Sequence, residues 1–147
     1  MNAANEAKAL TMLRQNGRAK ITDISRATGT PVSSTFEWLK GAGKEKLGRF
    51  TCLPNYAALD YNSRAFITLK CDKQQKPQLQ QRLANSPLVN SLWKINNGYD
   101  YLLDVITRSM GELENFLEVL EGKYTLKSKD VYFIIEEVKT EAWTPQP

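Results

Sequence analysis

The sequence predicts an α+β protein with a three-helix, (winged-)helix-turn-helix N-terminal domain and a β-α-β-β-α-β, ferredoxin-like C-terminal domain with a four-stranded antiparallel sheet. Apolar residues recur at helical spacing up to about residue 40 and at a period of two from about residue 64. A polar Asn96-Asn97-Gly98 break joins two apolar segments in the second half, as expected for a hairpin between strands. These observations together predict two small domains of different type.

The amino-acid composition indicates a globular protein. The chain has 147 residues, of which 41% are hydrophobic and 24% charged, as in ordinary globular proteins. No apolar run approaches the roughly 20 residues that span a bilayer, and the first residues do not have the pattern of a secretory signal. We therefore expect a cytoplasmic protein without membrane contact.

The chain contains no histidine and only two cysteines, Cys52 and Cys71, which do not form a CxxC motif. The absence of histidine argues against His-based general base catalysis and His-paired nucleophiles. The cysteine spacing argues against a disulfide framework or a cysteine zinc site. We expect no catalytic residues, no metal and no cofactor.

The first domain is predicted from three short helices over residues 5–16, 21–28 and 31–40. Gly29 ends the second helix, and Thr30 is a suitable N-cap for the third. Two helices joined by such a tight turn form a helix-turn-helix, whose second helix enters the major groove of DNA.

Candidate DNA contacts follow from that motif. We expect Val32, Phe36 and Leu39 to face the core, and the other side of the third helix to face DNA. Nearby lysines and arginines would contact phosphates, which position a protein on DNA without reading its sequence. The resulting DNA-binding candidates are Arg26, Thr30, Ser33, Ser34, Thr35, Glu37, Trp38, Lys40, Lys44 and Lys46.

The basic charge is concentrated in the first third of the chain. Residues 1–53 have nine Lys/Arg and four Asp/Glu, a net +5, whereas residues 54–147 have eleven and twelve, a net −1. This asymmetry favours contact with phosphate. The alternative is a three-helix bundle that binds nothing, because the third helix contains Glu37 and no arginine.

The domain boundaries are predicted at changes in the pattern. We expect the helix-turn-helix domain at 1–46, a linker with a strand (46–53) at 47–62, and the ferredoxin-like domain at 63–147. Ser109 and Glu112 form a capping-box pattern at the start of the second helix of that domain. The predicted elements of the second domain are strands at 64–71, 89–95, 101–107 and 128–140, and helices at 77–85 and from 110.

The strands of the second domain are apolar on both faces, but two helices can cover only one. The residues expected on the uncovered face are Phe66, Leu92, Ile106, Tyr132 and Ile134. Another copy of the same sheet is the simplest cover. We therefore predict a homodimer formed by sheet packing.

The hairpin is the candidate ligand site. Asn97 and Gly98 are residues that adopt positive φ, and Asp100 follows them closely. Its carboxylate could bind the amino group of a small ligand beside the exposed glycine backbone. The alternative is an exposed turn whose aspartate only satisfies nearby backbone N–H groups.

The order of these pieces resembles the Lrp/AsnC family of transcriptional regulators, whose C-terminal domain is the RAM domain. The similar segments are NGRAKITDISRATG, SPLVNSLWKINNGYDYLLDVITR and VYFIIEEVKTE. The resemblance implies double-stranded DNA as a partner, a dimer, tetramer or octamer, and an amino-acid-like effector near the hairpin. It points to Asn97, Gly98, Tyr99, Asp100 and Asp104 as effector-binding residues, although Asn97 stands where the family usually has glycine.

The sequence is compatible with three functions. The first is a DNA-binding transcriptional regulator that responds to a small effector. The second is an oligomeric small-molecule sensor or assembly protein with weak or lost DNA binding, favoured by Glu37 and Trp38. The third is an enzyme similar in layout to siroheme decarboxylases, which are expected to use histidine, and this chain has none.

Overall fold

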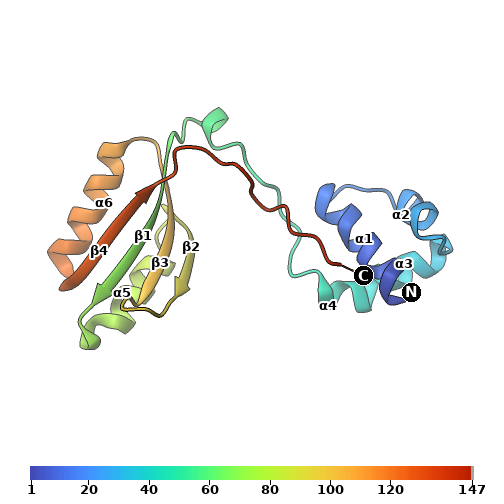
Figure 1. Cartoon of the computed structure of the whole chain (residues 1–147), viewed down its shortest axis with the longest axis horizontal. Helices are drawn as coiled ribbons and strands as arrows, with labels where there is room; N and C mark the ends of the chain where they lie inside the picture. The colour runs from blue at the N-terminus through green and yellow to red at the C-terminus, as the bar shows by residue number, and fades with distance from the viewer. Residues whose placement is uncertain (147) are drawn as a thin grey trace. The chain divides into compact units, whose positions relative to one another are not determined.

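The computed structural model describes residues 1–146, without the side chains of residues 42 and 43. The chain divides into two compact units, one of residues 1–54 with 138–147 and one of residues 55–137. Figure 1 labels the helices and strands of both units. We refer to them as the helical unit and the sheet unit. None of the helices described is long and apolar enough to cross a membrane.

The helical unit contains the predicted three helices and one more turn of helix. These are α1 (Ala3–Gln15), α2 (Ile21–Thr28), α3 (Val32–Lys40) and the short α4 (Ala42–Lys46). Gly29 ends α2 with φ = 63°, a left-handed conformation that glycine adopts without a Cβ clash. The core of the unit consists of Ala9, Leu13, Ile24 and Trp38.

The predicted orientation of the third helix is wrong. Val32 and Phe36, which we expected in the core, are 47% and 42% exposed, whereas Trp38 is only 6% exposed. The indole Nε1 of Trp38 donates a hydrogen bond of 2.9 Å to Glu6 on α1, which gives the buried ring a partner. Thr35 is also fully buried, and its hydroxyl donates to the carbonyl of Pro31 at 3.1 Å. Thr35 and Trp38 therefore do not lie on the exposed side of α3.

The tail over residues 138–147 belongs to the helical unit, although the sequence places it in the C-terminal domain. The guanidinium of Arg14 on α1 donates to the backbone carbonyl of Trp143 at 3.2 Å and forms an ion pair with Glu141. These two contacts explain why the tail is grouped with the helical unit. The functional division of the chain at residues 46 and 62 stays a prediction.

Residues 46–53 form no strand within the described chain, and no wing follows α3. A β-strand needs a neighbouring strand for its backbone hydrogen bonds, and this segment has none in the single chain. For the same reason the last strand ends at Phe133 rather than at residue 140. The strand predicted at 46–53 therefore does not form, and the last predicted strand is too long, because the sequence pattern does not show where strands pair.

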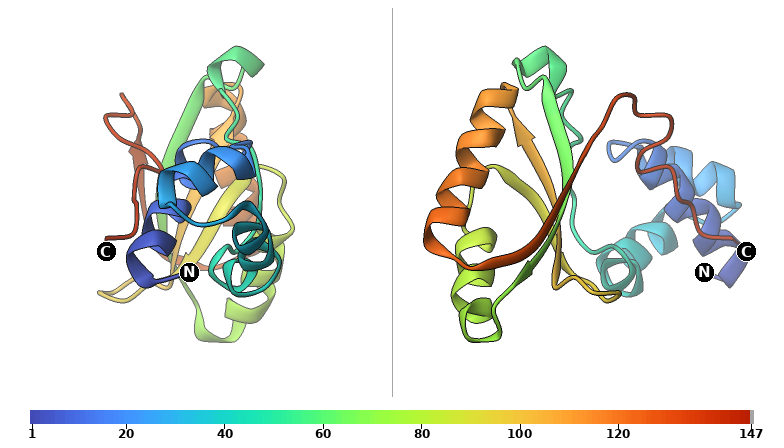
Figure 2. Two further views of the ribbon diagram at one scale, coloured as in Figure 1. Left: turned by 90° about the vertical axis from the view of Figure 1, so that its right-hand side faces the viewer. Right: turned by 60° about the vertical axis from the view of Figure 1, so that its left-hand side comes forward.

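The sheet unit has the predicted β-α-β-β-α-β order. Its elements are β1 (Ser63–Cys71), α5 (Lys76–Ala84), β2 (Val89–Lys94), β3 (Tyr101–Thr107), α6 (Met110–Lys123) and β4 (Leu126–Phe133), with short 3₁₀ turns η1 (Ala57–Leu59) and η2 (Lys73–Gln75). The strands are antiparallel in the order β2-β3-β1-β4. Both helices lie on the same side of the sheet (Figure 2). The predicted four-stranded ferredoxin-like architecture is confirmed.

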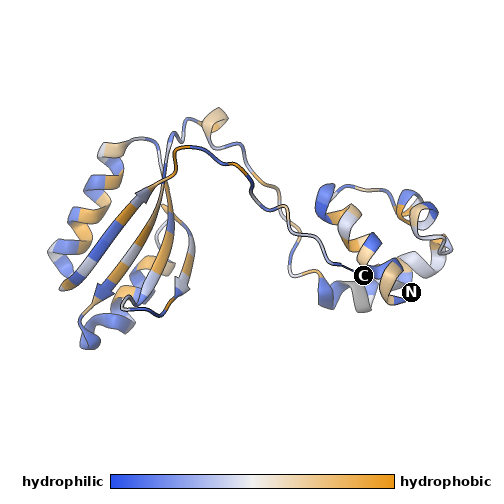
Figure 3. Cartoon of the chain, in the orientation of Figure 1, coloured by the Kyte–Doolittle hydropathy of each residue, from blue (hydrophilic) through white to orange (hydrophobic). Residues whose placement is uncertain are grey.

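The core of this unit lies between the sheet and its helices. Residues of β1 alternate between buried and half-buried along the whole strand, and apolar residues recur along each strand (Figure 3). Ser109 caps α6 as predicted, because its hydroxyl accepts the N–H of Glu112 at 3.2 Å. The buried residues are Ala65, Ile67, Leu69, Cys71, Leu79, Leu83, Tyr101, Leu103, Val105, Leu113, Leu117 and Leu120.

A bulge in β2 changes which of its residues face the core. Val89 is opposite Val105 and Ser91 is opposite Asp104, so β2 has one more residue than β3 at this point. Val89 and Leu92 therefore both pack against the core, and Trp93 is 45% exposed. The prediction of Leu92 on the uncovered face is wrong for this reason.

A buried ion pair joins the two central strands on the uncovered face. Arg64 of β1 donates to both carboxylate oxygens of Asp104 of β3 at 2.8 Å each. Asn90 of β2 donates to the same carboxylate at 2.7 Å, and Arg64 also pairs with Glu137, which follows β4. Hydrogen bonding to Asp104 raises the pKa of the Arg64 guanidinium. The side chain of Asp104 is only 2% exposed.

The substitution Asp104→Asn tests this ion pair. A neutral amide cannot accept from both guanidinium nitrogens, so the half-buried guanidinium of Arg64 loses its bidentate partner and keeps only Glu137. We expect the free energy of unfolding to fall by about 3 kcal/mol, measured by chemical denaturation of the full chain. Glu121→Gln, which removes an exposed pair with Lys129, is the control and costs less than about 1 kcal/mol. Equal effects of the two substitutions would contradict the structural role of Asp104.

Candidate functional site

The hairpin between β2 and β3 turns at Asn97 and Gly98. Their φ angles are 62° and 91°, so the predicted positive-φ turn is confirmed. The N–H of Ile95 donates to the carbonyl of Asp100 at 3.1 Å and closes the turn. Asn97 and Gly98 are both exposed at its tip.

Asp100 connects the hairpin to β1 and α5. Its backbone N–H donates to Leu69 at 2.8 Å, and its carboxylate accepts the N–H of Cys71 at 3.0 Å. The ammonium of Lys76, at the start of α5, pairs with the other carboxylate oxygen. Burial alone would raise the pKa of the Asp100 carboxyl, but the bonds from Lys76 and Cys71 outweigh it and lower the pKa. The carboxylate is therefore ionised at neutral pH.

An open pocket of about 690 Å³ lies beside Asp100, between α5 and the hairpin. The hydroxyl of Tyr101 donates to the carbonyl of Lys76 at 3.1 Å and fixes one wall. The pocket is lined by lysine ammonium groups, one carboxylate and glutamine amides, together with apolar side chains. The lining residues are Lys76, Pro77, Gln80, Gln81, Ala84, Lys94, Ile95, Asp100 and Tyr101.

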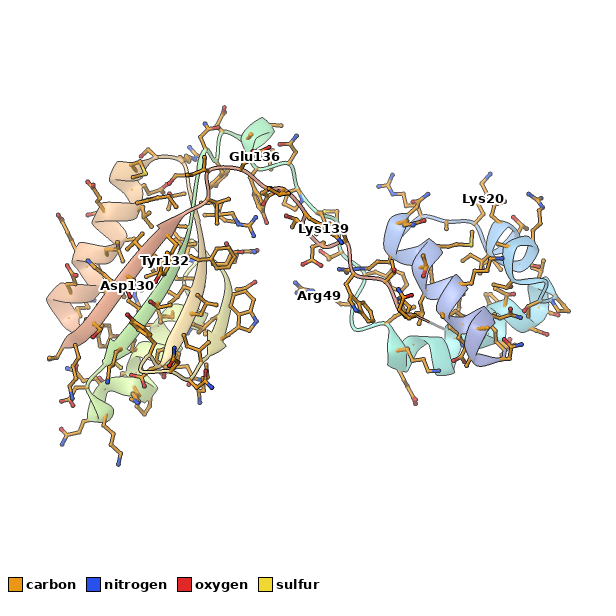
Figure 4. All side chains as sticks on the ribbon, viewed as in Figure 1. Lys20, Arg49, Asp130, Tyr132, Glu136 and Lys139 are labelled. Carbon is orange, nitrogen blue, oxygen red and sulfur yellow. The ribbon has the colours of Figure 1, made fainter. Side chains whose placement is uncertain are left out.

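Of the five residues expected to bind an effector, only Asp100 lines this pocket. Tyr99 instead donates its hydroxyl to Asp130 of β4, and this bond raises the pKa of the phenol. Figure 4 labels Asp130 together with Tyr132, two positions along the same strand. Asp104 is held by Arg64 on the uncovered face of the sheet.

Sequence reasoning missed the polar residues that line the pocket from α5 and from the end of β2. Lys76, Gln80 and Gln81 belong to α5, and Lys94 ends β2. A signal was present, because Lys76 comes directly before Pro77, which marks a helix start, and a helix of this fold crosses back near the hairpin. That signal does not by itself identify the side of the helix that faces the hairpin.

The candidate DNA interface is the exposed side of α3. Its members lie at helical positions i, i+1, i+4, i+5 and i+8, which share one side of a helix. The ammonium of Lys40 lies 4.8 Å from the centroid of the Phe36 ring. The residues of this surface are Val32, Ser33, Phe36, Glu37 and Lys40, and we call it the outer face of α3.

The other predicted DNA contacts differ in accessibility. The side chain of Arg26 is 82% exposed, and Lys44 is also exposed. Lys46 pairs with Glu6, and bonds from Lys46 and Trp38 lower the pKa of that carboxyl. Thr30 is half-buried, and its carbonyl accepts the Ser25 hydroxyl at 2.6 Å. Ser34 is exposed but lies away from the outer face.

Comparisons with known proteins agree with this architecture. The model of the Lrp/AsnC ligand binding domain matches residues 64–144. The HTH-type transcriptional regulator FL11 of Pyrococcus furiosus is 27% identical over 126 residues, which cover 81% of this chain and 83% of that protein. FL11 of Pyrococcus horikoshii is 26% identical over the same length.

Two solved structures share the fold over nearly the whole chain. A transcriptional regulator from Neisseria meningitidis in complex with L-Met has a TM-score of 0.84 at 20% identity, with 95% of this chain and 94% of that chain covered. E. coli AsnC has a TM-score of 0.79 at 16% identity, with 95% and 96% covered. Because the family match includes more than half of the sequence, the chain belongs to the Lrp/AsnC family of transcriptional regulators, which are not enzymes.

Proposed function

We propose that this regulator binds double-stranded DNA through its helical unit, with α3 in the major groove. The observation that carries this proposal is the outer face of α3, which stands exposed in a helix-turn-helix within the basic part of the chain. Arg26, Lys40 and Lys44 are exposed and would contact phosphates. The relatives described above as HTH-type transcriptional regulators support the same function.

Binding of the full chain to its own gene's upstream duplex, against a scrambled duplex, tests this function. If three basic side chains of each of two copies contact phosphates, log K falls with log salt with a slope of about −5. The double substitution Arg26→Ala, Lys40→Ala should reduce that slope, and Lys127→Ala in the sheet unit should not.

Binding to the upstream duplex that is tenfold or more tighter than to the scrambled duplex would indicate sequence-specific recognition. Equal binding to both duplexes would leave only a nonspecific phosphate contact. No binding even at low salt would overturn DNA binding and favour the oligomeric sensor, for which Glu37 on the outer face of α3 is the supporting observation.

We propose that a second copy of the chain covers the uncovered face of the sheet. Phe66 and Trp93 stack there with ring centroids 6.5 Å apart, and Tyr132 is 56% exposed on the adjacent strand β4. Apolar groups gathered on one face of a sheet are typical of an interface. A twofold axis would place the same residues on both sides of it.

Tyr132→Glu tests this interface, because it would bury two unpaired carboxylates in the dimer. We expect light scattering at micromolar concentration to give a mass of two or more chains for the wild type and of one chain for the variant. Val119→Glu, on the exposed side of α6, is the matched control and keeps the wild-type mass. A monomeric wild type would contradict the proposal.

We propose that the effector is a small zwitterion of the amino-acid class, bound in the pocket between α5 and the hairpin. The pocket presents Asp100 for an ammonium group and the lysines Lys76 and Lys94 for a carboxylate. Since Lys76 already pairs with Asp100, a ligand ammonium would share or replace that contact. The L-Met complex of the Neisseria regulator supports this ligand class.

Thermal unfolding of the full chain with each of the twenty L-amino acids tests the effector. A ligand at 100 times its dissociation constant should stabilise the protein by about 2.7 kcal/mol. Asp100→Asn should weaken binding by about tenfold or more, whereas Asp60→Asn, an exposed aspartate outside the pocket, should not change it. Unchanged binding by Asp100→Asn would place the ligand elsewhere.

A further inference from the structure

The outer face of α3 contains two exposed apolar side chains at its start, where a recognition helix approaches the bases most closely. Val32 is the first residue of α3 and Phe36 follows one turn later. They are 47% and 42% exposed although the same helix buries Trp38 and Thr35. The helical unit is therefore folded with these two residues facing outward.

The contacts of α3 fix this orientation. Trp38 is anchored to Glu6 by a hydrogen bond of 2.9 Å, and Leu39 packs against the core from the same side. A rotation of α3 that buried Phe36 would break the bond of the indole and expose Trp38. The exposed phenyl ring is thus a stable feature of the surface.

The apolar side chains of the outer face of α3 match one chemical group that base pairs present in the major groove. The thymine C5-methyl is the apolar group that base pairs present there. Arginine, the usual reader of guanine, is missing from α3, and the only basic residue on its outer face, Lys40, lies against the Phe36 ring. The exposed residues on this side are therefore better suited to methyl groups than to guanine edges.

We propose that Val32 and Phe36 read thymine C5-methyl groups, so that this regulator selects DNA by apolar contacts rather than by an arginine–guanine pair. The proposal rests on the proposed DNA binding. Lys40 then holds the Phe36 ring from one side and places its ammonium toward a phosphate. Glu37, beside Phe36 on the same face, can accept from the N4 amino group of a neighbouring cytosine.

The experiment compares the upstream duplex prepared with thymidine and the same duplex prepared with deoxyuridine, which pairs identically but has no methyl group. We expect deoxyuridine to weaken binding of the wild-type full chain by about fourfold for each methyl group buried. Phe36→Ala should weaken binding to the thymidine duplex and reduce the difference between the two duplexes, and the double variant Val32→Ala, Phe36→Ala should bind both duplexes equally. Val119→Ala, an exposed aliphatic residue of the sheet unit, should keep the wild-type difference.

The outcomes separate this inference from the proposed function. Salt-dependent binding of the wild type to both duplexes with equal affinity would overturn methyl reading and leave DNA binding intact. A difference of wild-type size that persists in a folded Val32→Ala, Phe36→Ala double variant would come from the shape of the DNA, and would also overturn methyl reading. Failure to bind either duplex would remove both proposals, and far-UV circular dichroism establishes that each variant is folded.

Discussion

The ion pair between Arg64 and Asp104 is the contact on which the arrangement of the sheet unit depends. Arg64 lies on β1, which pairs with both β3 and β4. Its guanidinium pairs with Asp104 of β3 and with Glu137 beyond β4, and Asn90 of β2 donates to the same Asp104 carboxylate. The guanidinium thus connects β1 with β3 and with the segment after β4, on the face of the sheet that no helix covers. Removing the Asp104 charge leaves the half-buried guanidinium with the exposed Glu137 as its remaining ion-pair partner, which compensates it less well. The polar cluster therefore adds side-chain contacts between the strands on the face that no helix packs against.

The two faces of the sheet differ in their side chains. The helix-covered face holds the apolar core, and its edge at α5 and the hairpin forms the pocket beside Asp100. The other face combines the Arg64 cluster with Phe66, Trp93 and Tyr132, which keep large exposed or half-exposed rings. The pocket proposed for the ligand and the surface proposed for assembly thus lie on opposite sides of the sheet. Successive side chains of a strand point to opposite faces of the sheet, so a shift of one strand moves residues on both faces.

The sequence predicted features set by local preference and missed those set by distant partners. The turn at Asn97-Gly98, the stop at Gly29 and the cap at Ser109 follow from the residues themselves. The orientation of α3 does not, because it depends on Glu6, 32 residues before Trp38. The bulge in β2 likewise depends on how β2 pairs with β3. The ion pair between Arg64 and Asp104 depends on the pairing of β1 with β3. Of the pocket, only Asp100 was predictable, since the lysines and glutamines are brought to it by folding.

The contact between α1 and the tail has a consequence for the order in which the helical unit is completed. Arg14 is separated by 127 and 129 residues from its partners Glu141 and Trp143. During translation the helices leave the ribosome first, and the whole sheet unit is made before the tail. A nascent chain therefore holds the three helices with the Arg14 side chain still without these partners. The first unit to be synthesised is the last to gain all of its contacts.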